Sequence, residues 1–386
     1  MPPRADWHYP TRVRFGCGRI EELGEACAEA GIRRPLLVTD RGLAAAAPVA
    51  HARRALEAAG LPVAVFAEVA SDPDEAVLRE GIAAFRGAGA DGVVAVGGGS
   101  ALDVGKLVAF QQGQRRPVWD FEDVGDNWRR ADATAIAPVV AVPTTAGTGS
   151  EVGRAAVLVD TRGDKRILFH PRMMPRAVVA DPELTVGLPR PLTVGTGMDA
   201  FAHAFEAYCA PGFHPLADGI AVEGMRLVAT ALERAASVPD DLEARSRMLA
   251  ASIMGGTAFQ KGLGAVHALS HPLGGRFHVH HGTLNAVLLP YVAVFNRPAV
   301  EERIAHLAAW LGLEARFEAF LDWLLDFRAR LGVPAGLREL GLPEDAGEAI
   351  AEAALRDPSA AGNPRPLRRD DVIALYRRAW AGDPPR

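Results

Sequence analysis

The hydrophobic positions in the first half of the chain fall into short, continuous runs separated by amphipathic stretches. Because these runs do not alternate with polar residues, they predict strands buried on both faces of a sheet. The predicted strands cover residues 34–40, 62–67, 92–96 and 137–142. The predicted helices between them cover residues 43–59, 74–87 and 101–111. Strands that alternate with helices of this length indicate βαβ units around a parallel sheet.

The pattern changes beyond about residue 182, where long helical periodicities replace the short apolar runs. The predicted helices there cover residues 195–210, 215–236, 241–256, 299–311, 316–331 and 370–381. Residues 357–366 are predicted as a loop, because proline and glycine interrupt them repeatedly. The proline-rich stretch 188–191 is a candidate hinge. We therefore expect an α/β domain over residues 1–185 and an all-helical domain over residues 186–386.

Composition narrows the class of protein without identifying it. The chain has 386 residues, 49% of them hydrophobic and 23% charged, with a net charge of −5, which excludes a disordered chain. The basic footprint of a nucleic-acid binder is missing, and no apolar stretch is long enough for a membrane span. The three cysteines lie far apart without metal-binding spacing, so no disulfide framework is expected. These features predict a cytoplasmic enzyme without nucleic-acid or membrane partners.

Two glycine-rich loops follow predicted strands. Residues 97–100, Gly-Gly-Gly-Ser, lie between a buried strand and a helix, where backbone N–H groups and the helix dipole suit a phosphate. Residues 144–150 form a second loop, rich in hydroxyl groups and glycine, after the next strand. Ligands of open α/β sheets bind at such strand ends. The alternatives are a tight turn for the first loop and an ordinary connection for the second.

Asp40 ends the first of these buried strands. A carboxylate at a strand end can accept hydrogen bonds from both hydroxyls of an adenosine ribose, and it would repel a 2′-phosphate. Asp40 therefore favours NAD over NADP. The alternative is a local role, with the Asp40 carboxylate capping the backbone of the segment that follows.

A second set of residues suits a metal ion. Asp199 and His203 are four residues apart, so a helix would place them on one face. Five of the 11 histidines fall between His267 and His281. Imidazole and carboxylate ligands together suit a divalent first-row metal such as iron(II) or zinc. The alternatives are a buried hydrogen-bonded Asp–His pair, and a helix in which His267 and His271 are incidental.

Taken in order, several segments closely resemble the iron-containing (group III) alcohol dehydrogenases, and the resemblance covers almost the whole chain. The matching segments are GGGSALDVGK (97–106), PTTAGTGSEV (143–152), ADPELTVGLP (180–189), GMDAFAHAFEAY (197–208), FQKGLGAVHALSHPLGGRFHVHHGTLNAVLLP (259–290) and NPRPLRRDDVIALYRRAW (363–380).

The resemblance implies an N-terminal Rossmann-type nucleotide-binding domain, a C-terminal all-helical domain that holds the metal, and a cleft between them for the nicotinamide. The implied metal ligands, for Fe²⁺ or possibly Zn²⁺, are Asp199, His203, His267 and His281. His271 matches a further active-site histidine that is not a ligand. The implied NAD contacts are Asp40, Asp72, Gly98, Gly99, Ser100, Asp103, Thr144, Thr145, Thr148 and Lys165. A homodimer or larger homo-oligomer is also implied.

Some positions depart from the family pattern. The family often has Asn in place of Asp72 and Pro in place of His280, so His278 and His280 are additional polar groups, placed either in the substrate pocket or in solvent. Maleylacetate reductases tend to have Asn in place of Asp199, and glycerol dehydrogenases and dehydroquinate-synthase-like proteins use a three-ligand zinc set. We therefore expect a metal-dependent enzyme that interconverts a small alcohol and its aldehyde or ketone with NAD. A maleylacetate-reductase-like or glycerol-dehydrogenase-like enzyme, or a non-catalytic nucleotide- and metal-binding protein, is the alternative.

Overall fold

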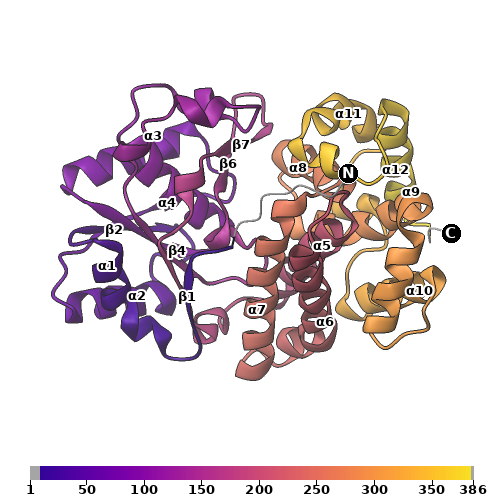
Figure 1. The fold of residues 1–386 in the computed structure, drawn as a ribbon, viewed down its shortest axis with the longest axis horizontal. Helices are drawn as coiled ribbons and strands as arrows, with labels where there is room; N and C mark the ends of the chain where they lie inside the picture. The colour runs from indigo at the N-terminus through magenta and orange to yellow at the C-terminus, as the bar shows by residue number, and fades with distance from the viewer. Residues whose placement is uncertain (1–8, 384–386) are drawn as a thin grey trace. The chain divides into compact units, whose positions relative to one another are not determined.

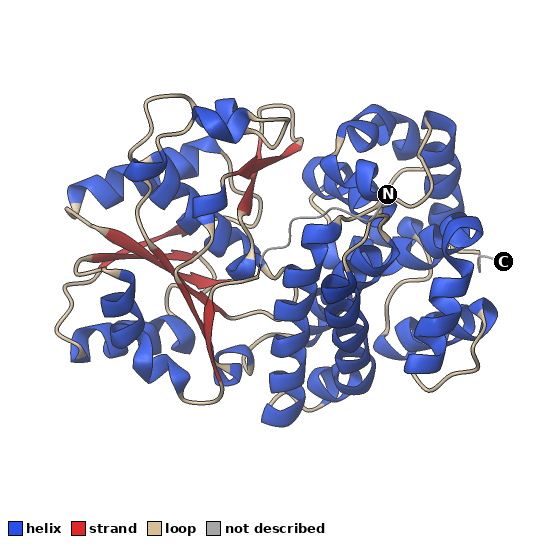
Figure 2. Ribbon diagram, viewed as in Figure 1, coloured by secondary structure: helices blue, strands red, loops and turns tan. Residues whose placement is uncertain are grey.

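A computed structural model describes residues 9–383, which form two compact units. The division falls between Leu188 and Pro189. Figure 1 labels the helices and several of the strands, and every strand within residues 9–383 belongs to the first unit (Figure 2).

The first unit is built on a six-stranded sheet in the order β1-β8-β5-β4-β2-β3, with every neighbouring pair parallel. Its strands are β1 (Arg12–Phe15), β2 (Pro35–Asp40), β3 (Ala64–Val69), β4 (Gly92–Gly97), β5 (Val139–Pro143) and β8 (Ala177–Ala180). Its helices are α1 (Leu23–Ala30), α2 (Ala47–Ala58), α3 (Glu75–Gly87) and α4 (Gly99–Gln111). A separate antiparallel hairpin consists of β6 (Ala155–Val159) and β7 (Lys165–Phe169).

Helices cover both faces of the six-stranded sheet (Figure 2), which explains the continuous apolar runs. In β4, Val93 and Ala95 belong to the hydrophobic cluster that includes α3 and α4. Val94 and Val96 belong to the cluster that includes α1 and α2. Successive side chains of a strand point to opposite faces, so a strand buried on both sides needs apolar residues at every position. The predicted parallel sheet is confirmed.

Four strands escaped prediction, namely β1, β6, β7 and β8. Each has only four or five residues, at the short end of what an apolar run can reveal. β1 and β8 pair with each other across the unit, with Arg12 opposite Ala177, so their formation depends on a contact between residues distant in sequence. β6 has the sequence AAVLV, a continuous apolar run that the prediction overlooked, whereas β7 begins with the charged residues Lys165 and Arg166.

The second unit contains only helices among its described residues, 189–383, which confirms the predicted fold class. They are α5 (Arg190–Cys209), α6 (Pro215–Ser237), α7 (Leu242–Ala258), α8 (Ala265–Phe277), α9 (His281–Trp310), α10 (Phe317–Leu331), α11 (Ala346–Arg356) and α12 (Arg369–Ala381). α5 packs against α6, α7 and α9 and is buried along almost its whole length. No helix within residues 9–383 has the length and apolar character needed to cross a membrane.

Helix α9 differs from the prediction of a helix over residues 299–311, because it begins eighteen residues earlier at His281 and passes through Pro290 and Pro298. Proline lacks the N–H that would bond to the carbonyl four residues before it. For Pro290 that carbonyl belongs to Ala286, and the buried Arg328 guanidinium donates to it at 3.5 Å and to the Val287 carbonyl at 3.0 Å. A side chain from α10 thus compensates for the missing bond, which the local sequence does not reveal.

A buried charged cluster lies beneath the second glycine-rich loop. Lys106 on α4 is 1% exposed, pairs with Asp103 at 3.1 Å and donates to the carbonyl of Ser150 at 3.0 Å. Glu151 is also 1% exposed, and its Oε1 has no hydrogen-bond partner among the described residues. Burial raises the pKa of Glu151 to about 7, although the Lys106 charge opposes this rise.

We predict that Glu151→Gln changes how stability depends on pH. The pKa of Glu151 rises on folding from an ordinary value of 4.5 to about 7. The carboxyl group therefore favours the folded state fully below pH 4.5, and this contribution is lost as the pH rises through 7. The variant has no such loss, so its unfolding free energy relative to that of the wild type should rise by roughly 2 to 3 kcal/mol between pH 5 and pH 8.

Urea unfolding at the two pH values measures this difference. Glu80→Gln, at an exposed position of α3, is the matched control and should show no such change. Parallel pH dependence of Glu151→Gln and wild type would contradict the assignment.

Candidate metal centre and cofactor loops

The four predicted metal ligands come from three helices of the second unit. Asp199 and His203 lie one turn apart on α5, His267 lies in the first turn of α8, and His281 begins α9. The Nε2 atoms of His203, His267 and His281 lie 3.9, 3.7 and 3.7 Å from Oδ1 of Asp199. One oxygen is therefore surrounded by three imidazole nitrogens. The structure brings the four side chains together, and their role as ligands stays a prediction.

A close approach of backbones places His281 beside α5. A Cβ atom on Gly282 would lie 2.1 Å from the carbonyl oxygen of Gly195, so only glycine fits at this crossing. The His280 ring lies over Gly195, and its Nδ1 accepts a hydrogen bond from Thr283 N at 3.3 Å. The sequence placed His280 either in the substrate pocket or in solvent, and the structure shows that it caps the N-terminus of α9 next to His281.

The spacing of these atoms suits a divalent metal ion. Nitrogen and oxygen ligands about 2.1 Å from a tetrahedral ion lie about 3.4 Å from one another. The separations of 3.7–3.9 Å from Asp199 Oδ1 are only a few tenths of an ångström wider. The ligand atoms of Asp199, His203 and His267 all lie within 4.8 Å of one another, and all three residues are buried. A set of imidazoles with one carboxylate fits iron(II) or zinc.

The electrostatics of the cluster are those of a cation site. Burial alone would raise the pKa of Asp199, but His203, His281 and His267 hold it well below its usual range. Burial would lower the pKa of His267, but Asp199 and Glu206 together raise it to about 9. Two carboxylates therefore favour a positive charge at His267, and a metal ion would supply that charge in place of a proton.

Sequence reasoning missed Glu206, which holds His267 from the side opposite Asp199. Glu206 Oε2 lies 2.6 Å from Nδ1 of His267, and Oε1 accepts a hydrogen bond from Val266 N at 2.6 Å. A carboxylate at Nδ1 keeps the proton there and leaves the lone pair of Nε2 for a metal. The signal was present, because Glu206 follows Asp199 by seven residues and therefore shares its helix face.

Asn285 is a second residue that sequence reasoning missed. Its Nδ2 donates to Asp199 Oδ1 at 2.7 Å and lies 3.2 and 3.1 Å from Nε2 of His267 and His281. It follows His281 by four residues on α9, so their spacing predicts a shared face. This hydrogen bond from the Asn285 amide restrains Asp199 Oδ1, the oxygen that the three imidazole rings surround.

His271, the predicted additional histidine, lies one turn after His267 on α8. Its ring stacks on that of His281, with centroids 5.1 Å apart and planes at 14°. Its Nδ1 lies 2.7 Å from Oδ2 of Asp357, at the start of the segment predicted only as a loop. The structure thus gives His271 a carboxylate partner of its own.

The two glycine-rich loops lie together in the first unit, at the carboxyl ends of the adjacent strands β4 and β5. A Cβ on Gly98 would come within 3.2 Å of Thr145, and one on Gly99 would come within 2.7 Å of Thr148. These glycines therefore let the loops pack directly against each other. α4 begins at Gly99, so its free N–H groups face the same end of the sheet.

The remaining predicted cofactor residues are placed around this end of the sheet. Thr144 N donates to the carbonyl of Gly97 at 3.0 Å, and Ser100 Oγ donates to the carbonyl of Ser71 at 2.6 Å. Asp72 and Lys165, both predicted cofactor contacts, form an ion pair at 3.2 Å.

Asp40 and Asp103 already have partners within the protein. Asp40 Oδ1 accepts a hydrogen bond from Leu43 N at 3.0 Å, which is the local capping role, while burial raises its pKa. Asp103 accepts hydrogen bonds from Ser150 Oγ at 2.5 Å and Val157 N at 2.9 Å. Asp103 thus ties α4 to the second loop. Cofactor contact by any of these residues stays a prediction.

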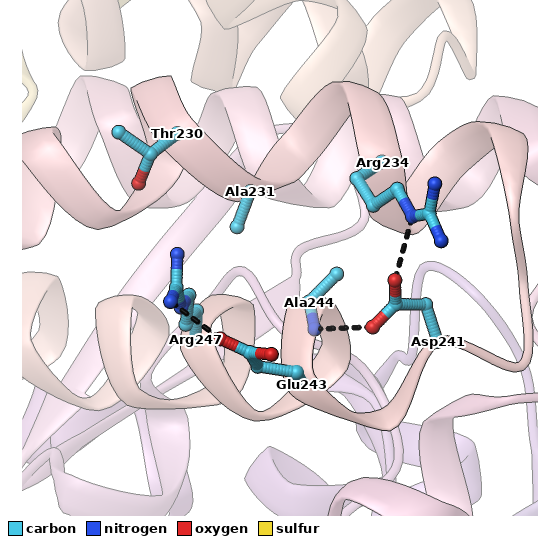
Figure 3. Close-up of a pocket in the computed structure, with 7 residues that line it drawn as sticks. All are labelled: Thr230, Ala231, Arg234, Asp241, Glu243, Ala244 and Arg247. Atoms are coloured by element: carbon cyan, nitrogen blue, oxygen red, sulfur yellow. Dashed lines mark hydrogen bonds and ion pairs between the residues drawn. The ribbon is translucent and has the colours of Figure 1, made fainter.

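A shallow pocket between α6 and α7 contains none of the predicted site residues (Figure 3). Its charged side chains pair with one another, Arg234 with Asp241 at 2.6 Å and Arg247 with Glu243 at 2.5 Å. These pairs leave little net charge to attract a ligand. Because the pocket contains no predicted site residue, Glu243 in it is suited to a control substitution.

Comparison with known proteins identifies the family to which both units belong. Residues 10–182 match the family model described as iron-containing alcohol dehydrogenase, and residues 193–380 match its C-terminal counterpart. The chain is 43% identical over 382 residues to 4-hydroxybutyrate dehydrogenase of Cupriavidus necator, covering 96% of this chain and 97% of the relative. It is 35% identical to NAD-dependent methanol dehydrogenase of Bacillus methanolicus, covering 96% and 98%. A crystal structure of 1,3-propanediol oxidoreductase superposes with a TM-score of 0.93 at 36% identity, covering 98% and 100%.

We predict that Glu206→Gln weakens metal binding about 10- to 100-fold, because the neutral amide no longer holds the Nδ1 proton of His267. The amide oxygen of the substituted side chain can still accept the bond from Val266 N, so α8 should begin as before. Metal affinity is measured by competition with a chromogenic chelator. Glu243→Gln, in the pocket of Figure 3, is the control and should bind metal like wild type. Equal affinities for the two variants would show that Glu206 does not support the site.

Proposed function

Because the chain belongs to the iron-containing alcohol dehydrogenase family, we propose that it transfers a hydride reversibly between a small alcohol and NAD. The protein is an oxidoreductase of a family that uses NAD and a divalent metal. We assign the metal, Fe²⁺ or alternatively Zn²⁺, to Asp199, His203, His267 and His281. The observation that carries this proposal is the gathering of three imidazole Nε2 atoms within 3.9 Å of the buried Asp199 Oδ1.

When bound, the metal supplies Lewis acidity at the substrate oxygen, and NAD supplies the hydride acceptor at C4 of its nicotinamide. In the oxidative direction the carbinol C–H bond breaks and its electron pair leaves with the hydrogen. The O–H bond also breaks, and we assign its proton to Nε2 of His271 on the way to water. The products are the aldehyde or ketone, NADH and one proton, so atoms and electrons balance.

The residues of the first unit would bind NAD at the carboxyl end of the parallel sheet. The N-terminus of α4 and the packed loops at Gly98, Gly99, Ser100, Thr144, Thr145 and Thr148 suit the pyrophosphate. Asp40 suits the adenosine ribose, and Asp72, Asp103 and Lys165 would order the loops beside it.

We further propose that the protein works in the cytoplasm as a homodimer or larger homo-oligomer on a small-molecule alcohol or aldehyde. The free thiols of Cys27 and Cys209 are buried, and burial raises the pKa of each to about 12. Such thiols are compatible with a reducing compartment. The relatives' names suggest 4-hydroxybutyrate, 1,3-propanediol and methanol as a first substrate panel.

We predict that Asp199→Ala abolishes metal binding and lowers the rate of NAD-linked alcohol oxidation about 1,000-fold. The reason is that Lewis-acid stabilisation of the transition state is worth several kcal/mol. Elemental analysis and turnover on the alcohol panel test this together. Asp322→Ala, at an exposed position of α10, is the control and should keep both. An Asp199→Ala protein that kept metal and full activity would overturn the metal assignment.

We predict that Asp40→Asn raises the ratio of kcat/KM for NADP over NAD about tenfold, because it removes the charge that repels a 2′-phosphate. An asparagine oxygen can still accept the Leu43 N–H, so the turn should persist. Steady-state kinetics with both cofactors measure the ratio. A wild-type preference for NADP, or a ratio unchanged by the substitution, would disprove the role given to Asp40.

A further inference from the structure

We infer that Asp357 is a positioning residue for the reaction, which holds His271 in the tautomer and orientation that receive the substrate proton. This inference rests on the proposed function, because it deepens the role given there to His271. It assigns chemistry to a residue that lies 86 positions further along the chain, in a segment whose sequence predicts only a loop.

The contact is short and buried. Nδ1 of His271 lies 2.7 Å from Oδ2 of Asp357, and the two side chains are 11% and 5% exposed. The other oxygen, Oδ1, accepts a hydrogen bond from Ser359 N at 2.8 Å, so the carboxylate cannot rotate without losing a bond. Asp357 begins the short 3₁₀ turn Pro358–Gly362, which packs against α8. A fixed carboxylate thus meets one nitrogen of the ring.

The chemistry of the pair determines which nitrogen carries the proton. An ionised carboxylate only accepts hydrogen bonds, so Nδ1 of His271 must be the donor. Burial would raise the pKa of Asp357, but His271 and Ser359 keep it below its usual value, so the group is a carboxylate at neutral pH. The proton on Nδ1 leaves the lone pair on Nε2, and only a lone pair can accept the hydroxyl proton of a substrate.

Asp357 and Glu206 therefore make matched contacts with different consequences. Each places a carboxylate oxygen 2.6–2.7 Å from Nδ1 of a histidine on α8. For His267, the Nε2 atom that is left without a proton lies 3.7 Å from Asp199 Oδ1, within the metal cluster. His271 is one turn further along and stacks on His281, so its ring lies beside the same centre, and the lone pair left on its Nε2 can serve proton transfer there.

A double-mutant cycle tests the inference kinetically. Asp357→Asn should lower kcat for alcohol oxidation about 10- to 100-fold, with KM values within about threefold of wild type. Metal content and NADH affinity should be unchanged. If Asp357 acts only through His271, the substitution should have no further effect in a His271→Ala background. An equal loss of kcat in both backgrounds would overturn the inference, because it would indicate a scaffold role for Asp357.

A spectroscopic measurement tests the tautomer with Asp357 unaltered, so it does not depend on the folding of Asp357→Asn. Zinc-loaded protein labelled with ¹⁵N-histidine should show a downfield Nδ1-bound proton that is absent from His271→Ala. A His271 protonated on Nε2 instead would overturn the inference. Inactivity of wild type on every alcohol would overturn the proposed function and the relay with it. Wild-type activity that Asp357→Asn leaves intact would overturn the relay alone.

Discussion

The buried carboxylate of Asp199 is the constraint on which the helical unit depends. Its Oδ1 is 2.7 Å from an amide donor on α9 and under 4 Å from imidazoles on α5, α8 and α9. An isolated ionised carboxylate would be costly at this depth, so the surrounding groups must be cationic or must bind a cation. The close crossing of α5 and α9 at Gly195 and Gly282 makes this gathering possible. The packing of α5 against α9 therefore brings the predicted ligands together, and their interactions in turn stabilise the buried Asp199 carboxylate.

Two histidines of α8, His267 and His271, are each oriented by a different carboxylate. Glu206 holds the Nδ1 proton of His267, and Asp357 holds that of His271. Without these carboxylates, each ring could place its proton on either nitrogen, and neither Nε2 would reliably be an acceptor. The two partners come from α5 and from the turn after α11, so the arrangement exists only once the helical unit has formed.

Much of this account could be predicted from the sequence, for identifiable physical reasons. Buried parallel strands such as β4 need apolar residues at every position, and the glycines beside them mark where backbones approach a ligand or a second loop. The i, i+4 spacing of Asp199 and His203 is readable because helix periodicity is local. What escaped prediction depends on distant contacts. β1 forms only against β8, the passage of α9 through Pro290 relies on Arg328 from α10, and Asp357 contacts His271 across 86 residues. Glu206 and Asn285 share helix faces with Asp199 and His281, but their contacts with His267 and Asp199 join different helices, which local spacing does not reveal.

The most direct test of the metal centre is to locate the ion itself. Crystals of the protein loaded with Fe²⁺, measured on both sides of the iron absorption edge, should give one anomalous peak in the second unit. We predict that it lies about 2.0–2.3 Å from Asp199 Oδ1 and from the Nε2 atoms of His203, His267 and His281. A peak at other residues, or the absence of any peak from protein that is fully active on alcohols, would contradict this account.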